Sequence, residues 1–256
     1  MEHDFGALLK QWRSLRRMSQ LDLGVEAVVS SRHISFLETG RARPSREMVL
    51  HLGEVLDVPR SDRNLMLEAA GFAAAYRARS LESDEMRAVR QAAEWMIERH
   101  QPYPALMIDR HWRLVGANRP AMVMLGGFGL AEGDSFLDAL LGDGLRAAID
   151  NWTEFGRHLL TRLRSENSAA GGDPVLEDAI GRLAADPTLT AGVAGPLPPF
   201  VPTRFRMGDT TLSFLSTLAH FAGAEDVTLA DLRIELLFPA DENTRQILNL
   251  FAGESN

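Results

Sequence analysis

The stretch Ser19–Gly40, SQLDLGVEAVVSSRHISFLETG, decides how the first part of this chain folds. Ser19 can cap a helix, and Asp22 follows three residues later as an acidic variant of the capping box. Ser30 can cap a second, shorter helix. Gly40 ends that helix, as glycine does just beyond a helix C-terminus. The stretch therefore predicts two helices joined by a tight turn.

Apolar residues at helical spacing continue the pattern on both sides of this stretch. They predict further helices over residues 4–17, 45–58 and 61–70. In the helix that Ser30 caps, Ile34 and Leu37 are expected to face inward. Five short helices within residues 1–72 predict a compact all-α domain.

Two helices joined in this way are the layout by which a small protein places one helix end in the DNA major groove. At a helix N-terminus, the amide of Gln20 can meet a phosphate. Arg32 can donate two hydrogen bonds to guanine O6 and N7, and an outward Phe36 can make an apolar contact with a thymine methyl group. The candidate DNA-binding residues are Arg13, Gln20, Ser31, Arg32, His33, Ser35, Phe36, Arg41 and Arg43. The alternative is an ordinary helical domain with solvated arginines.

Residues 13–58 resemble the helix-turn-helix domain of the Xre/Cro/C1 repressor family along their whole length. The matching pieces are Arg13-Ser-Leu-Arg-Arg, Ser19-Gln20-Leu21, Ile34-Ser35-x-Leu37-Glu38-x-Gly40, Pro44-Ser45 and Leu52-Gly-Glu-Val-Leu56. The resemblance implies that Gln20 contacts phosphate and that bases are faced by Ser31, Arg32 and Phe36. It also implies a structural Glu38 tied to a nearby arginine. The chain departs from the family at the turn, where Val28-Val29 stands in place of the usual glycine.

The net charge of −8 is unusual for a DNA-binding protein, but it is unevenly distributed. Residues 1–80 hold 12 basic and 10 acidic residues, a net charge of +2, whereas residues 81–256 hold 15 and 25, a net charge of −10. Local field governs phosphate binding more than the charge of the whole chain. Because a net charge of +2 is small for a DNA-binding domain, we expect the DNA affinity to depend steeply on salt and to need dimerisation.

A connecting segment over residues 73–83 leads to a second domain over residues 84–256. β-Hairpins are indicated over residues 105–117 and 201–221, and a further strand over 229–238. The expected helices are 84–100, 118–125, 134–149, 152–166, 174–185 and 241–251, and the Gly- and Pro-rich residues 189–200 are expected to form a loop. The pattern predicts an α+β domain with an antiparallel sheet of about five strands.

A small sheet with helices over one face can enclose an apolar pocket between its layers, and such pockets often hold a small ligand. The second domain is rich in Phe, Met and Leu, so an apolar ligand is the natural expectation. The alternative is that its phenylalanines only build the core.

The second domain resembles the MmyB-like ligand-binding domain over roughly residues 84–250. The matching pieces are Pro104-Ala-Leu-Met-Ile-Asp, Trp112, Asn118, Gly144-Leu145-Arg146, Asn151-Trp152, Arg162-Leu163-Arg164, Asp173-Pro174, Gly208-x-x-x-Leu212-Ser213-Phe214-x-Ser216-Thr217, Asp226-Val-Thr-Leu and Phe238-Pro239-Ala-Asp241. In many bacterial regulators this domain follows an Xre-type domain. The resemblance implies a PAS-like sheet fold and the sensing of a small, fatty-acid-like molecule.

A carboxylated apolar ligand needs a cationic or hydrogen-bonding anchor, and Arg suits a bidentate carboxylate contact. His158, Arg162 and Arg164 lie on one amphipathic helix; the alternative for these arginines is a solvated face. The candidate ligand-binding residues are Met96, Leu106, Ile108, Asn118, Phe136, His158, Arg162, Phe205, Phe214, Ser216 and Phe238.

We therefore expect a ligand-responsive transcriptional regulator that binds an operator in double-stranded DNA as a homodimer and requires no cofactor. The alternative is an antitoxin-like or adaptor protein whose large domain binds a protein partner. An enzyme is disfavoured because the seven histidines show no HExxH spacing and there is neither a Walker loop nor a G-x-S-x-G motif. The absence of cysteine excludes disulfides and thiolate metal sites. With neither a signal peptide nor a membrane-length apolar run, a cytoplasmic protein is expected.

Overall fold

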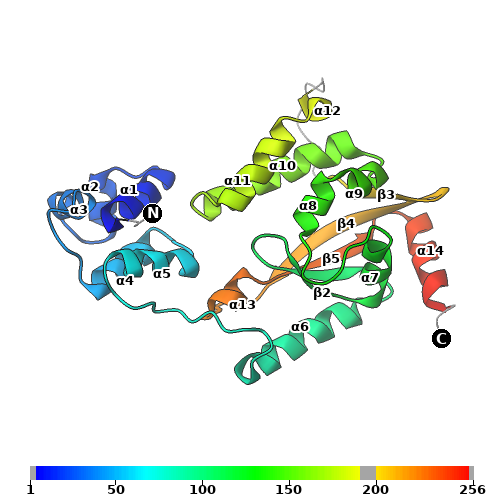
Figure 1. Ribbon diagram of the computed structural model, residues 1–256, viewed down its shortest axis with the longest axis horizontal. Helices are drawn as coiled ribbons and strands as arrows, with labels where there is room; N and C mark the ends of the chain where they lie inside the picture. The colour runs from blue at the N-terminus through cyan, green and yellow to red at the C-terminus, as the bar shows by residue number, and fades with distance from the viewer. Residues whose placement is uncertain (1–3, 191–199, 254–256) are drawn as a thin grey trace. The chain divides into compact units, whose positions relative to one another are not determined.

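The computed structural model describes residues 4–190 and 200–253, and the chain divides into two compact units. We call the first the helical unit; it comprises Met1–Ala78 with two short segments, Glu166–Asp173 and Ala224–Val227. The second, which we call the sheet unit, contains the rest of the chain and every strand (Figure 1).

The five predicted helices of the helical unit are confirmed. They are α1 (Phe5–Leu15), α2 (Gln20–Glu26), α3 (Ser31–Glu38), α4 (Arg46–Val55) and α5 (Arg60–Ala69). Ser19 caps α2 by accepting a hydrogen bond from the backbone N–H of Asp22, and the Asp22 carboxylate completes the capping box. Ser30 and Ser45 cap α3 and α4 in the same way, so three of the helix starts are set by local side chains.

The five helices enclose a single apolar core that contains Ile34 and Leu37, as predicted. Close approach of α1 to the end of α3 needs a glycine at position 6. A Cβ atom there would stand 2.6 Å from the backbone oxygen of Glu38. The core therefore fixes how α3, the helix expected to face DNA, sits on α1.

Each of the five helices ends in a residue with a left-handed backbone. These residues are Arg17, Val28, Gly40, Asp57 and Gly71, with φ between +46° and +86°. The N–H of the following residue bonds the carbonyl oxygen five positions earlier, as in Val29 to Gly24 and Val58 to Gly53. This is the Schellman arrangement, which usually has glycine at the left-handed position.

Val28 is the strained member of this set. It lies in the turn between α2 and α3 with φ +53°, and its side chain is 90% exposed. A β-branched residue in the left-handed region is strained. Because the Val28 side chain is exposed, burial of apolar surface does little to offset this strain.

Val28→Gly is therefore expected to stabilise the helical unit by about 1 kcal/mol, because glycine adopts this backbone without steric cost. Urea denaturation of the whole chain measures the change. The matched control is Val25→Gly, at an exposed position inside α2, which should cost about 0.5 kcal/mol. A destabilised Val28→Gly protein would contradict the strain assigned to this turn.

The sheet unit begins with a short 3-10 helix, η1 (Asp84–Met86), that leads into α6 (Arg87–Arg99). Its strands are β1 (Ala105–Ile108), β2 (Leu114–Ala117), β3 (Thr203–Met207), β4 (Thr210–His220) and β5 (Arg233–Pro239). The remaining helices are α7 (Arg119–Gly126), α8 (Phe136–Leu141), α9 (Asp143–Ala148), α10 (Trp152–Ala169), α11 (Pro174–Ala184), α12 (Pro187–Thr190), α13 (Val227–Asp231) and α14 (Glu242–Gly253).

The five strands form one antiparallel sheet in the order β2-β1-β5-β4-β3, which confirms the predicted α+β domain with about five strands. Side chains alternate between its two faces. On one face, Ala105, Met107 and Ile234 pack against α6. On the other face, Leu106 and Leu237 join a larger core with the helices that lie between β2 and β3 in sequence.

Three predicted segments differ in the structure. The single helix expected over residues 134–149 is divided at Gly142, whose extended backbone (ψ 165°) separates α8 from α9. The strand expected over 229–238 begins only at Arg233, because Val227–Asp231 form α13. Leu189 and Thr190 of the expected loop belong to α12, and residues 191–199 lie outside the described residues.

Within residues 4–190 and 200–253, no helix combines the length and the apolar character that crossing a membrane requires.

Candidate functional site

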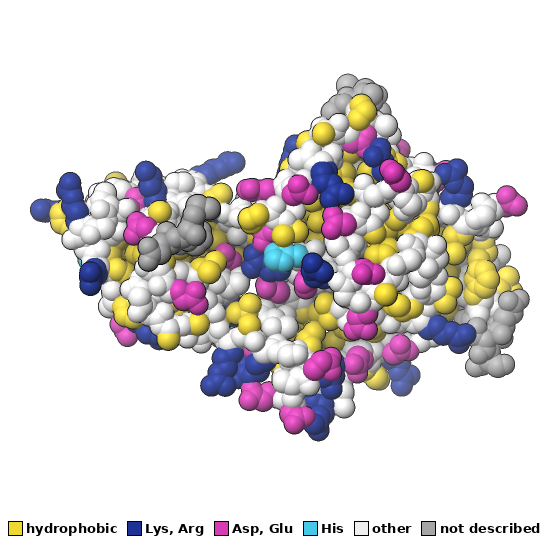
Figure 2. Space-filling model, in the orientation of Figure 1, with side chains coloured by type: hydrophobic (Ala, Val, Ile, Leu, Met, Phe, Trp, Pro, Cys, Tyr) yellow, Lys and Arg dark blue, Asp and Glu magenta, His cyan; other side chains and the backbone are white. Residues whose placement is uncertain are grey.

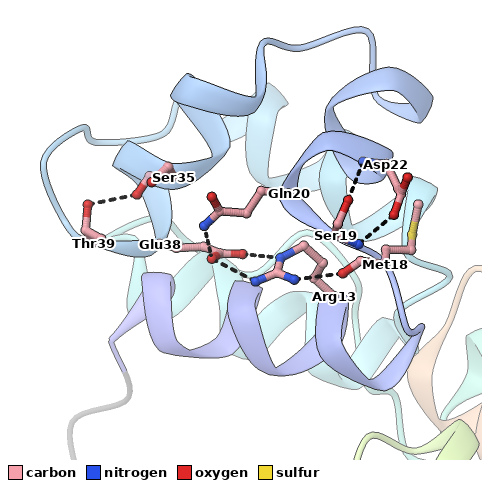
Figure 3. Close-up of polar contacts among 8 residues, drawn as sticks. All are labelled: Arg13, Met18, Ser19, Gln20, Asp22, Ser35, Glu38 and Thr39. Atoms are coloured by element: carbon pink, nitrogen blue, oxygen red, sulfur yellow. Dashed lines mark hydrogen bonds and ion pairs between the residues drawn. The ribbon is translucent and has the colours of Figure 1, made fainter.

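A buried ion pair holds the helix-turn-helix together. Arg13 of α1 donates from Nε to Glu38 Oε1 (2.6 Å) and from Nη2 to Glu38 Oε2 (3.0 Å), while its Nη1 donates to the backbone oxygen of Met18 (2.7 Å). The side chain of Glu38 is 3% exposed and that of Arg13 is 12% exposed. The Nε2 of Gln20, the first residue of α2, also donates to Glu38 Oε2 at 2.7 Å (Figure 3). One carboxylate thus joins α1, α2 and α3.

Glu38 remains ionised in this setting. Burial by itself raises the pKa of Glu38, but the hydrogen bonds from Arg13 and Gln20 and the charge of Arg13 outweigh burial and place the pKa below its usual value. The resemblance implies a structural Glu38 tied to an arginine, and the geometry agrees. Arg13 is a predicted DNA contact; in the structure its guanidinium bonds Glu38 and Met18 and so positions the helices, while contact with DNA stays a prediction.

Arg32 is exposed on the first turn of α3, and its guanidinium carbon lies 5.2 Å from the ring centroid of Phe36, one turn later. Ser31, His33, Ser35 and Phe36 are half-buried. The backbone oxygen of Ser35 accepts a hydrogen bond from Thr39 at the end of the helix (Figure 3). The structure therefore places Arg32 and Phe36 together on one side of α3, opposite the buried Ile34 and Leu37.

Exposed arginines surround this part of the helical unit. Arg41 and Arg43, the candidate phosphate contacts, lie in the loop between α3 and α4 and are both exposed. Arg16, by contrast, donates to the backbone oxygens of Leu56 and Asp57 at the end of α4. Figure 2 shows basic side chains along the edge of the helical unit where α2 and α3 lie.

A second candidate site is a cavity of about 300 Å³ inside the sheet unit, between the sheet and helices α7, α8 and α10. Its volume lies at the lower end of the range for small-molecule sites. Most of its wall is apolar. The lining residues are Leu106, Trp112, Met124, Phe136, Leu140, Phe155, His158, Leu159, Arg162, Phe200, Val201, Thr203, Phe205, Leu215, Ser216, Glu235 and Leu237. A larger hollow of about 390 Å³ at the start of α10 is lined mainly by polar and charged residues, so it suits an apolar ligand less well.

One end of the cavity is polar. Arg162 Nη1 of α10 donates to Glu235 Oε1 of β5 at 2.6 Å, and Ser216 Oγ of β4 donates to the same oxygen at 2.7 Å. The guanidinium carbon of Arg162 lies 4.2 Å from the ring centroid of Trp112, within cation–π range. The arginine is thus held by a carboxylate on one side and an indole ring on the other.

Two further features mark this end of the cavity. Burial, followed by the nearby charge of Arg162, lowers the pKa of His158 below its ordinary value, so the ring is neutral at pH 7. Trp112 is 1% exposed and has φ +61°. A bulky residue in the left-handed region has a strained backbone, and strained residues are often found at binding sites.

The structure brings together six of the predicted ligand-binding residues around this cavity: Leu106, Phe136, His158, Arg162, Phe205 and Ser216. Five others lie elsewhere. Met96 is exposed on α6, and Phe238 is 37% exposed with its ring 4.7 Å from that of His100. Ile108 and Phe214 are fully enclosed in the core.

Asn118, the fifth, is a structural residue. It is fully buried at the start of α7, where its Oδ1 accepts from the backbone N–H groups of Ala105 (2.9 Å) and Ala121 (3.2 Å). Its Nδ2 donates to the backbone oxygens of Ile97 (2.9 Å) and Tyr103 (2.8 Å). Four backbone groups occupy the whole amide, which corrects the expectation that Asn118 contacts a ligand.

Eleven of the cavity-lining residues were not predicted, among them Glu235 and the wall residues Met124, Phe155 and Leu159. Glu235 had a signal in the sequence, because it is the only charge within the apolar run Ile234–Phe238 of a predicted strand. The wall residues had none, because an apolar side chain that lines a cavity and one that fills a core look alike in sequence. Among the described residues, no group of three His, Asp or Glu side chains is placed to hold a metal ion.

Comparisons with known proteins cover both units. Residues 89–251 match the family described as the MmyB-like transcription regulator ligand binding domain, and residues 4–66 match a family described as a helix-turn-helix domain. The first match alone extends over more than half of the chain. No curated protein matches the chain.

Proposed function

Because the chain belongs to the family of MmyB-like transcription regulators, with a helix-turn-helix domain for DNA and a ligand-binding domain, we propose that it is a ligand-responsive regulator of transcription. The family is one of regulators and not of enzymes. In the proposed function, α3 reads the bases of an operator, and a small apolar, fatty-acid-like molecule in the cavity shifts the population that binds DNA.

The observation that carries the DNA part of this proposal is the arrangement of Gln20 and Arg32. The buried Glu38 orients the Gln20 amide at the start of α2, and Arg32 is exposed at the start of α3. These are the positions from which a helix-turn-helix contacts phosphates and bases. The concave and mostly apolar cavity favours a small ligand, whereas the docking of a protein partner needs an exposed apolar patch.

A homodimer on a palindromic or near-palindromic operator is part of the proposal. The net charge of +2 in residues 1–80 supplies few phosphate contacts, and Arg13 and Arg16 use their donors inside the protein. A second copy doubles the phosphate contacts on one operator, and the two recognition helices then read half-sites one turn of DNA apart.

Arg32→Ala tests base reading. The variant is expected to lose about 1–3 kcal/mol of binding free energy on the specific operator and to relax the preference at one base pair. Operator selection from random DNA, followed by fluorescence anisotropy at several salt concentrations, measures both effects. The protein fold should be unaffected because Arg32 is exposed.

Two controls separate base reading from charge. Arg43→Ala removes an exposed charge from the loop after α3 and should weaken binding to operator and random DNA alike. Arg164→Ala removes an exposed charge from α10 and should leave DNA binding unchanged. An equal loss for Arg32→Ala on operator and random DNA would contradict base reading by Arg32.

A further inference from the structure

The polar end of the cavity has no net charge to offer a ligand. Among the described lining residues, Arg162 and Glu235 are the formally charged pair, and they already bond each other at 2.6 Å. His158 adds no charge at pH 7, because burial and Arg162 lower its pKa. Arg162 carries no charge in excess of that of Glu235, so a bound anion would give this end of the cavity a net negative charge.

Glu235 is firmly placed. It lies in β5, the central strand of the sheet, paired with Leu106 of β1 and Leu218 of β4, and it is 5% exposed. A ligand carboxylate that bonded Arg162 would set two carboxylates on one guanidinium inside a site of low dielectric. Like charges in such a site disfavour each other, and displacing Glu235 would leave a buried carboxylate without its cation.

A neutral head group meets no such penalty. Glu235 Oε1 accepts from Arg162 and Ser216, while Glu235 Oε2 accepts no hydrogen bond from any described residue. A hydroxyl or primary amide on the ligand can donate to Oε2 and leave the ion pair intact. A hydrogen bond to a charged acceptor is worth more than one between neutral groups, so this contact fixes the orientation of the ligand.

We propose that the cavity selects a neutral amphiphile, an alkyl chain that ends in a hydroxyl or carboxamide donating to Glu235, over the corresponding carboxylate anion. The apolar wall of Leu106, Met124, Phe136, Leu159 and Phe205 receives the chain. The inference rests on the proposed sensing of an apolar ligand, and it assigns Glu235 the role of rejecting anions as well as binding the head group.

The test compares decan-1-ol with decanoate at pH 8 on the full chain by isothermal titration calorimetry. The unmodified protein is expected to bind decan-1-ol about tenfold more tightly than decanoate. In Glu235→Gln, Arg162 loses its carboxylate partner and the order is expected to reverse. Glu177→Gln, which makes the same change at an exposed position on α11, should keep the original order.

The outcomes separate the two proposals. Equal or tighter binding of decanoate by the unmodified protein would overturn the neutral head group and leave apolar sensing in place. An unchanged preference in folded Glu235→Gln would equally overturn the role of Glu235. If neither probe bound, both the proposed apolar sensing and this inference would fail. The comparison on the unmodified protein is decisive whether or not Glu235→Gln folds.

Discussion

Asn118→Ala is expected to destabilise the sheet unit by about 3–5 kcal/mol, the largest effect of any substitution considered for this protein. The amide of Asn118 is fully buried and bonds four backbone groups. Alanine leaves two N–H groups and two carbonyl oxygens without a partner, and each unsatisfied buried group costs about 1–3 kcal/mol before relaxation or water entry reduces the sum. It also removes the cap of α7.

Urea denaturation followed by tryptophan fluorescence measures this loss, since Trp112 lies in the core of the same unit. Asn249→Ala is the matched control. It makes the same chemical change at an exposed position of α14 and should alter stability by less than about 0.5 kcal/mol. A loss below about 1 kcal/mol for Asn118→Ala would contradict the structural role and return Asn118 to the candidate ligand contacts.

Glu38→Ala should destabilise the helical unit by about 3 kcal/mol, because it leaves the guanidinium of Arg13 largely buried without its anion. Differential scanning calorimetry of the whole chain measures the shift of the transition that belongs to the helical unit. DNA affinity should fall as well, since Gln20 loses the acceptor that orients it. The double variant Arg13→Met, Glu38→Leu removes both charges together and is expected to recover most of the stability but not the DNA affinity.

The same pair has a pH signature. The pKa of Glu38 is lower in the folded chain than its ordinary value of 4.5, so its stabilising contribution is complete above that value and is lost as the pH falls through the folded pKa. The unmodified protein should therefore lose helical-unit stability below about pH 4.5 more steeply than Glu38→Ala does. Parallel acid dependence in the two proteins would contradict the ion pair as a source of stability.

Local chemistry explains why so much of the helical unit was predictable. Ser19, Ser30 and Ser45 act within three residues of their own positions, and a sequence displays such spacings directly. Ile34 and Leu37 are buried because their spacing places them on one face of a helix. The left-handed Val28 was harder, since the sequence marks the missing glycine but does not show whether the backbone changes to suit valine.

The sheet unit was less predictable because its decisive contacts join distant residues. Arg162 and Glu235 are 73 positions apart, and their pairing depends on how α10 lies over the sheet. Asn118 carries the same side chain whether it binds a ligand or four backbone groups, and only the fold places Ile97, Tyr103, Ala105 and Ala121 around it. Apolar spacing also failed to separate α13 from β5, since both segments are short and Leu229 and Leu232 extend the apolar pattern of β5 toward α13.

The hydrogen bond from Gln20 to Glu38 lowers the conformational entropy that the side chain of Gln20 would lose on binding DNA. A glutamine on the surface samples many rotamers, and fixing one of them in a complex costs conformational entropy. Here the carboxylate already selects the rotamer in the free protein, and the second hydrogen of the amide remains for a phosphate. In the proposed complex, the Gln20 side chain therefore already has its binding rotamer when DNA arrives. The entropy cost of fixing this rotamer falls on folding and not on DNA binding.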